Sequence, residues 1–102
     1  MNEQRAIELL QAQIRDYARQ RAKDVARGAE TPRLAALLVQ KYGKGVVDAL
    51  AVVFDSARSA DPIMAVVDEE VSRIDPLWQE HNREREHNRE RWAGRPADVV
   101  AN

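Results

Sequence analysis

The residues best suited to recognition chemistry are concentrated near the C-terminal end of the chain. Residues 80–85 read Glu-His-Asn-Arg-Glu-Arg, and residues 86–91 repeat the same six residues. Trp78 and Trp92, the two tryptophans of the chain, flank this repeat. They lie fourteen residues apart, so on a helix they project to nearly the same side. Between them, at heptad spacing, this side also carries His81, Arg85 and Asn88.

This stripe is too polar for a domain core or for a stable coiled-coil seam. Tryptophan and arginine are enriched at binding hot spots, so the pattern predicts a partner-binding surface. Its expected contacts are Trp78, His81, Arg85, Arg89 and Trp92. The same face could also bury both tryptophans in a symmetric dimer. In the alternative interpretation the last helix is an ordinary solvated charged helix. Trp78 then closes the bundle, and Trp92 folds back and packs against it.

A second candidate surface is a basic ridge near the N-terminal end. Its cations are spaced four residues apart, and they are Arg15, Arg19, Lys23 and Arg27. Like charges at this spacing repel on a helix, so the ridge does not serve local stability. It predicts an anion-facing surface for nucleic-acid backbone or for an acidic partner. The alternative is an ordinary solvated face, with Asp16 and Asp24 nearby.

Metal binding and catalysis have little support in the residue pattern. The chain has no cysteine, and His81 and His87 are six residues apart, about 240° around a helix. Glu84 and His87 match one step of the carboxylate-bridged di-iron pattern, but a second copy would have to come from a dimer, and further carboxylates from Glu69 or Glu70. No serine lies in a nucleophile-elbow context. We therefore expect no metal, no cofactor and no enzymatic activity.

Composition places the chain among small folded domains. It has 102 residues, of which 44% are hydrophobic and 32% charged, which is too apolar for a disordered chain. The longest apolar run, residues 49–54, is too short to span a bilayer. The N-terminal residues do not have the pattern of a secretory signal. We therefore expect a cytoplasmic location without membrane contact. The net charge of −1 weighs against a dedicated nucleic-acid binder.

Proline and glycine divide the chain into helical segments. Residues 3–27 are predicted to form a helix, because their apolar residues fall in one stripe at helical spacing. Arg21 lies within this stripe, and it is expected to extend to solvent or to pair with an acid such as Glu70. Gly28 is expected to end this helix. Thr31 and Pro32 then give a cap and a first helical residue for the next one.

The second half is divided in the same way. The glycines at 43 and 45 predict a helix end, followed by a separate helix over residues 46–58. Residues 46–57 are apolar on most sides, so they are expected to be the most buried element. Asp61-Pro62 and Asp75-Pro76 predict two further boundaries, and the last helix extends from about 76 to 93.

The sequence therefore predicts an all-α fold: a small, single-domain bundle of about five helices, with a long, polar and projecting last helix. Residues 1–94 are assigned to the bundle and 95–102 to a flexible tail. The predicted function is a non-catalytic regulator or inhibitor that occludes or bridges a protein partner. Inhibitors made by phages and mobile elements share this size and lack of catalytic residues. The alternatives are an accessory factor that binds nucleic-acid backbone through the basic ridge, and a structural homodimer.

Overall fold

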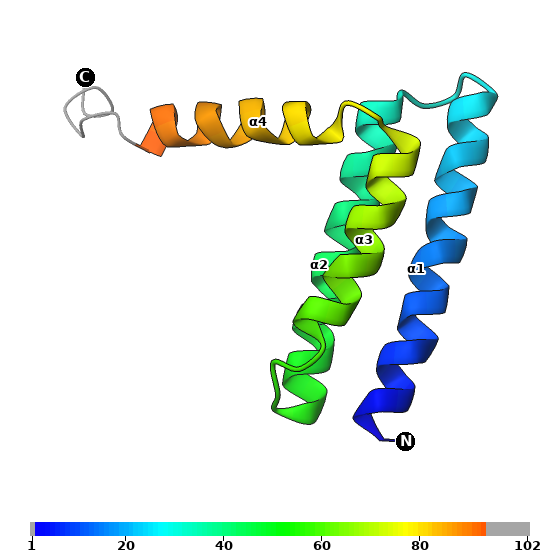
Figure 1. The fold of residues 1–102 in the computed structure, drawn as a ribbon, viewed down its shortest axis with the longest axis vertical. Coiled ribbons are helices and arrows are strands. Elements are labelled where there is room, and N and C mark those ends of the chain that lie inside the picture. The colour runs from blue at the N-terminus through cyan, green and yellow to red at the C-terminus, as the bar shows by residue number, and fades with distance from the viewer. Residues whose placement is uncertain (1, 94–102) are drawn as a thin grey trace.

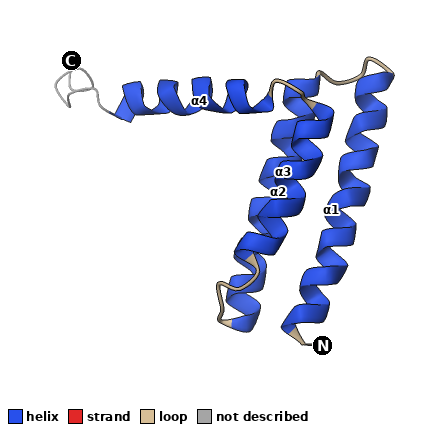
Figure 2. Ribbon diagram, in the orientation of Figure 1, coloured by secondary structure: helices blue, strands red, loops and turns tan. Residues whose placement is uncertain are grey.

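The helix boundaries follow the capping residues of the sequence. The computed structural model describes residues 2–93, with side chains as far as Arg89. This part of the chain contains four helices and no strand, so the all-α class is confirmed (Figure 2). The helices are α1 (Glu3–Ala26), α2 (Pro32–Phe54), α3 (Ala60–Ile74) and α4 (Trp78–Ala93). The predicted boundary at residue 94 and the tail 95–102 lie outside the described residues.

Short polar side chains begin the first two helices. Asn2 accepts a hydrogen bond on Oδ1 from the backbone N–H of Arg5 at 2.7 Å. Thr31 accepts one on Oγ1 from the backbone N–H of Leu34 at 3.1 Å. Such caps satisfy donors that have no partner inside the helix. Gly28 follows the end of α1 with φ +76°, a conformation that glycine adopts without a steric cost.

The predicted break at residues 43–45 is wrong, and this accounts for the helix count of four instead of five. α2 continues through both glycines as one helix of 23 residues. Gly43 is buried, and a Cβ atom built on it would overlap the side chain of Val67 on α3. This glycine therefore serves a close approach between two helices, and it does not end one. Glycine in a helix interior costs about 0.5–1 kcal/mol relative to alanine, and the tight packing offsets that cost.

The prediction that residues 46–57 are the most buried element is also wrong. Leu50 is buried, but Val52 and Val53 are 82% and 72% exposed. α2 packs mainly on α1 and α3 and has few contacts with α4, so its apolar residues extend around more of the helix than the bundle covers. The most completely buried side chains include Ile63, Val67 and Val71, which all lie on α3.

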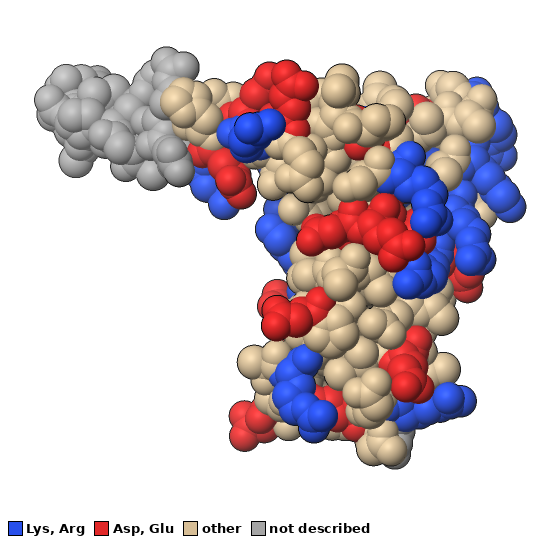
Figure 3. Space-filling view, viewed as in Figure 1, with Lys and Arg blue, Asp and Glu red and all other residues tan. Residues whose placement is uncertain are grey.

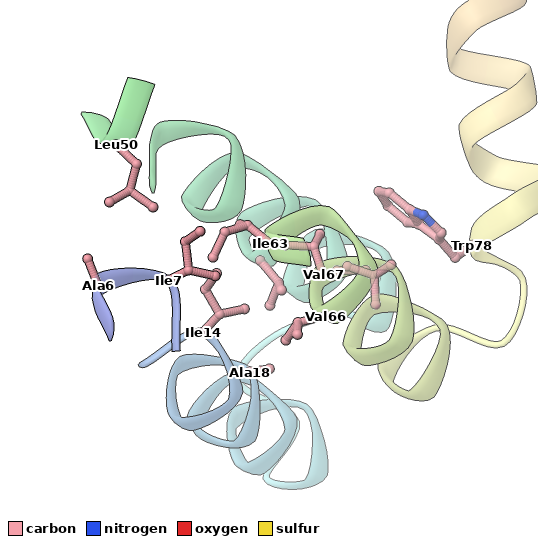
Figure 4. Packing of buried hydrophobic residues seen from close by; sticks show 12 residues of the cluster. Ala6, Ile7, Ile14, Ala18, Leu50, Ile63, Val66, Val67 and Trp78 are labelled. Atoms are coloured by element: carbon pink, nitrogen blue, oxygen red, sulfur yellow. The ribbon is translucent and has the colours of Figure 1, made fainter. Parts of the chain in front are cut away.

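The core lies between α1, α2 and α3 (Figure 4). Its fully buried side chains include Ile14 of α1 and Val39 of α2, and these pack with the valines and isoleucine of α3. Burial of each such side chain contributes about 1.5–3 kcal/mol. Tyr17 and Tyr42 stack beside the core with ring centroids 4.5 Å apart, which holds α1 against α2.

The fourth helix does not join this bundle along its length. α4 leaves the end of the bundle where α1 meets α2 and extends sideways away from α1 (Figure 1). Its few contacts are with α2 and α3. None of the described helices combines the length and the apolar character that a membrane span requires.

Candidate functional site

The turn between α3 and α4 is organised around one buried carboxylate. Asp75 is 3% exposed and accepts a hydrogen bond on Oδ1 from the backbone N–H of Leu77 at 3.1 Å. Its other oxygen, Oδ2, lies 2.7 Å from Nδ1 of His81. A carboxylate oxygen accepts in such a pair, and Nδ1 of the imidazole donates in the tautomer that carries the proton there. Asp75 therefore fixes both the start and the first turn of α4.

Trp78 packs the same turn against the bundle. Its side chain is 4% exposed and belongs to the hydrophobic core cluster, at the edge nearest α4 (Figure 4). The placement matches the alternative in which this tryptophan closes the bundle. In this arrangement its ring is largely inaccessible to a partner.

Arg85 lies over the Trp78 ring and connects α4 to α2. Its guanidinium carbon is 5.5 Å from the ring centroid, within range of a cation–π interaction. Its Nη2 donates to Oε1 of Gln40 at 3.0 Å and to Oδ1 of Asn82 at 2.7 Å. Gln40 is 8% exposed, so this contact lies at a buried position of α2. Sequence reasoning identified Arg85, and it identified Asp75 as a helix boundary but not as the partner of His81. It missed Gln40, because the partner of Gln40 lies on another helix.

Beyond Arg85 the helix has no such attachment among its described side chains. We call the part of α4 from Arg83 onward the arm. Its described residues other than Arg85 are all exposed, and they are Arg83, Glu84, Glu86, His87, Asn88 and Arg89. The predicted surface is thus divided: Trp78, His81 and Arg85 attach the helix, while Arg89 faces solvent. The side chain of Trp92 lies outside the described residues.

The basic ridge on α1 is largely paired with carboxylates. Arg15 lies 3.4 Å from both Glu69 and Glu70 of α3, and Arg19 lies 3.1 Å from Asp16. In Figure 3 basic side chains gather over the C-terminal half of α1, next to an acidic patch over α3.

The remaining ridge cations differ in their pairing. Arg27 pairs with Asp24, whereas Lys23 is exposed. The exposed pairs contribute little energy, about 0–1 kcal/mol each, but each carboxylate offsets the positive potential beside it. Three of the four ridge cations have such a neighbour.

Arg21 pairs locally, and the suggested partner Glu70 is taken by other residues. The guanidinium of Arg21 lies 2.6 Å from Asp24 and 3.1 Å from Glu30, and 5.5 Å from the Tyr17 ring centroid. Glu70 pairs instead with Arg15 and with Arg73 of its own helix. Arg21 therefore connects α1 to the turn that follows it, through ion pairs with Asp24 and Glu30.

An exposed apolar surface on α2 is a feature that sequence reasoning assigned to the core. Besides Val52 and Val53, the exposed large hydrophobic residues include Leu34 at 46% and Tyr42 at 36%. On α1, an open groove of about 570 Å³ lies over another partly apolar stretch. Its lining residues are Ala6, Leu9, Leu10, Ala12, Gln13 and Asp16. The only signal in the sequence was that residues 46–54 are apolar on too many sides for one interface.

The described residues contain no cluster of three or more histidine, aspartate or glutamate side chains that could hold a metal ion. His81 is engaged with Asp75, and His87 lies on the exposed arm.

Comparisons with protein-family models, with curated protein sequences and with solved structures give no match to the chain.

Proposed function

We propose that the protein is a non-catalytic regulator or inhibitor that binds a protein partner through the arm of α4. One observation carries this proposal. The base of α4 is fixed to the bundle by buried polar and aromatic contacts, while the described side chains of the arm other than Arg85 are exposed. An element with this division of residues is held in position for contact with something outside the bundle.

The energetics of the arm support a role beyond structure. Isolated helices shorter than about 12–15 residues are marginal in water, and the arm, residues 83–93 of α4, has 11 residues. Its alternating charges at i, i+3 add only about 0.2–0.5 kcal/mol per pair. The described side chains of the arm add no residue to the core, so the arm adds little to the stability of the fold. Its attachment to Asp75 and Trp78 instead reduces the ordering cost of binding.

The roles within α4 differ along the helix. Trp78, His81 and Arg85 position the arm, and we assign partner contacts to Arg83, His87 and Arg89. These side chains offer hydrogen bonds and charge, which suits an exposed protein surface with carboxylates. Trp92 stays an anchor predicted from sequence, because tryptophan is enriched at hot spots.

Binding of nucleic-acid backbone through the basic ridge is the weaker candidate. Arg15, Arg19 and Arg27 each have a carboxylate within ion-pair distance. Phosphate contacts would have to compete with these pairs, and the net charge of the chain is −1.

Site-specific photo-crosslinking in the source cell tests the proposal. A photoreactive amino acid at position 87, on the arm, should capture one partner protein. The same amino acid at position 8, an exposed site on α1, should not capture it. The reversals Arg83→Glu and Arg89→Glu together should abolish capture from position 87, because they replace the cations assigned to partner contact.

A matched pair of reversals controls for net charge. Arg5→Glu with Arg33→Glu changes the charge by the same amount at exposed positions of the bundle, and it should leave capture intact. Capture that persists in the arm variant, or that occurs equally from position 8, contradicts the proposal. Circular dichroism of each variant confirms that the helices are retained.

A further inference from the structure

The bundle leaves one continuous apolar face of α2 open. Successive members of this face are three or four residues apart or adjacent, so they line one side of the helix. We call it the α2 face, and its residues are Leu34, Leu38, Tyr42, Gly45, Ala49, Val52 and Val53. All of them are exposed except Leu38, which is half-buried, and Tyr42 lies at the edge of the face, where it also stacks on Tyr17 of α1. Exposed apolar surface of this extent on a small domain commonly marks an interaction site.

Gly45, in the middle of this face, packs against no other described helix. A Cβ atom built on it would meet nothing within 4 Å, in contrast to Gly43 two residues before. Its backbone is helical, so no special φ requires glycine. Glycine here weakens the helix, and it gains nothing inside the bundle. A glycine at the centre of an open helix face does allow another backbone to approach closely.

Two opposite charges lie at nearly equal distances on either side of Gly45. Lys41 and Asp48 lie four residues before it and three residues after it. They are seven residues apart, so they lie along the same edge of the α2 face. Both are exposed, and neither makes an ion pair with another described residue.

We propose that the α2 face is the interface of a homodimer, in which α2 of a second copy packs antiparallel across it. The two-fold axis passes close to Gly45. This symmetry places Lys41 of each copy opposite Asp48 of the other, and the contact forms twice. It also places Leu38 opposite Val52, and the large Tyr42 opposite the small Ala49. Gly45 lies at the crossing point, where its missing side chain permits close helix packing.

The self-complementary pattern identifies the occupant as a second copy. A lipid surface would gain nothing from opposite charges placed symmetrically about one glycine, and an unrelated protein would not require this symmetry. The dimer is independent of the function proposed for α4. Gln40, to which Arg85 of α4 is bonded, is about 200° around the helix from Leu38, so both arms stay accessible.

A charge-exchange experiment tests the proposal with the full chain. Sedimentation velocity of the unmodified protein should give twice the monomer mass of 11.6 kDa at high concentration. Lys41→Asp alone places two aspartates opposite each other, and Asp48→Lys alone places two lysines opposite each other. Each variant alone should dimerise at least about tenfold more weakly. An equimolar mixture of the two should recover the dimer, because both contacts are then opposite in charge.

Gly45→Leu provides an independent test that does not depend on charge. Leucine favours the helix and points into open space in the single chain, so the variant should fold at least as well. It should nevertheless abolish the dimer, because the helices can no longer approach at the crossing. An apolar association without this geometry would become tighter instead.

Three outcomes overturn the proposal. They are a monomer at all concentrations, a dimer that Lys41→Asp and Asp48→Lys leave unchanged, and a dimer that Gly45→Leu strengthens. Binding of the unmodified monomer to lipid vesicles through Leu38 and Val52 would likewise replace it. Circular dichroism of every variant separates a loss of association from a loss of fold.

Discussion

Two glycines two residues apart in α2 show how much the surroundings of a single residue decide its role. Gly43 and Gly45 have the same helical backbone conformation, and the local sequence predicts a helix end at both. Gly43 contacts Val67, whereas Gly45 faces open space. A substitution at each position should therefore have opposite effects on the stability of the single chain.

Gly43→Ala should destabilise the fold by about 1–3 kcal/mol, as overpacking in a tight interface does. Chemical denaturation at low protein concentration measures this as a lower midpoint. Gly45→Ala is the matched control, and it should stabilise the helix by up to about 1 kcal/mol. Equal effects at the two positions would contradict the packing role assigned to Gly43.

Asp55 gives a second prediction at this scale. It ends α2 with φ 48° and ψ 51°, in the left-handed region that glycine occupies more readily. Asp55→Gly should therefore raise the free energy of unfolding by about 0.5–1 kcal/mol. The control is Asp68→Gly, at an exposed helical position of α3, which should be neutral or destabilising. A loss of stability in Asp55→Gly would show that the carboxylate itself has a structural role.

At the scale of elements, the parts that depend on local chemistry were predictable from the sequence. Thr31 and Pro32 begin a helix because a side-chain oxygen and a fixed φ act within one turn. The continuity of α2 was not predictable, because the partner of Gly43 lies on another helix. Similarly, the attachment of α4 depends on Gln40, which is 45 residues away in sequence from Arg85. The sequence placed the candidate partner-binding residues on one helix, which is α4, but it did not predict the division of this helix into a base and an arm.

The α3–α4 turn allows the attachment of an element to be tested. Asp75→Ala removes the acceptor for His81 and for the backbone N–H of Leu77, which should cost about 1–3 kcal/mol in local stability. Hydrogen exchange should accelerate in α4, while the amides of α1 and α2 stay protected. Asp68→Ala, on the exposed side of α3, is the control and should leave α4 unchanged. Uniform acceleration across all helices would mean that the carboxylate stabilises the whole bundle.

At the scale of the whole molecule, positive and negative charges are nearly equal in number, and their arrangement decides whether a surface attracts anions. The chain has 16 basic and 17 acidic residues. Carboxylates from α1 itself and from α3 accompany most cations of the basic ridge. The ridge that stands out in the sequence is thus combined with acidic side chains once the helices pack, as the neighbouring colours in Figure 3 show.

This pairing predicts weak affinity for nucleic acid. In a mobility-shift assay with duplex DNA at about 50 mM salt, no complex should form below about 100 µM protein, the weak limit of ordinary non-specific binding. Removing neighbouring carboxylates by Asp16→Asn with Glu69→Gln should produce binding that falls steeply between about 50 and 200 mM salt. That gain would show that the acids mask the ridge. If the unmodified chain already binds, and the double change Arg19→Glu and Lys23→Glu removes the binding, the ridge contacts phosphates despite its ion pairs. The backbone-binding function would then take precedence over the arm.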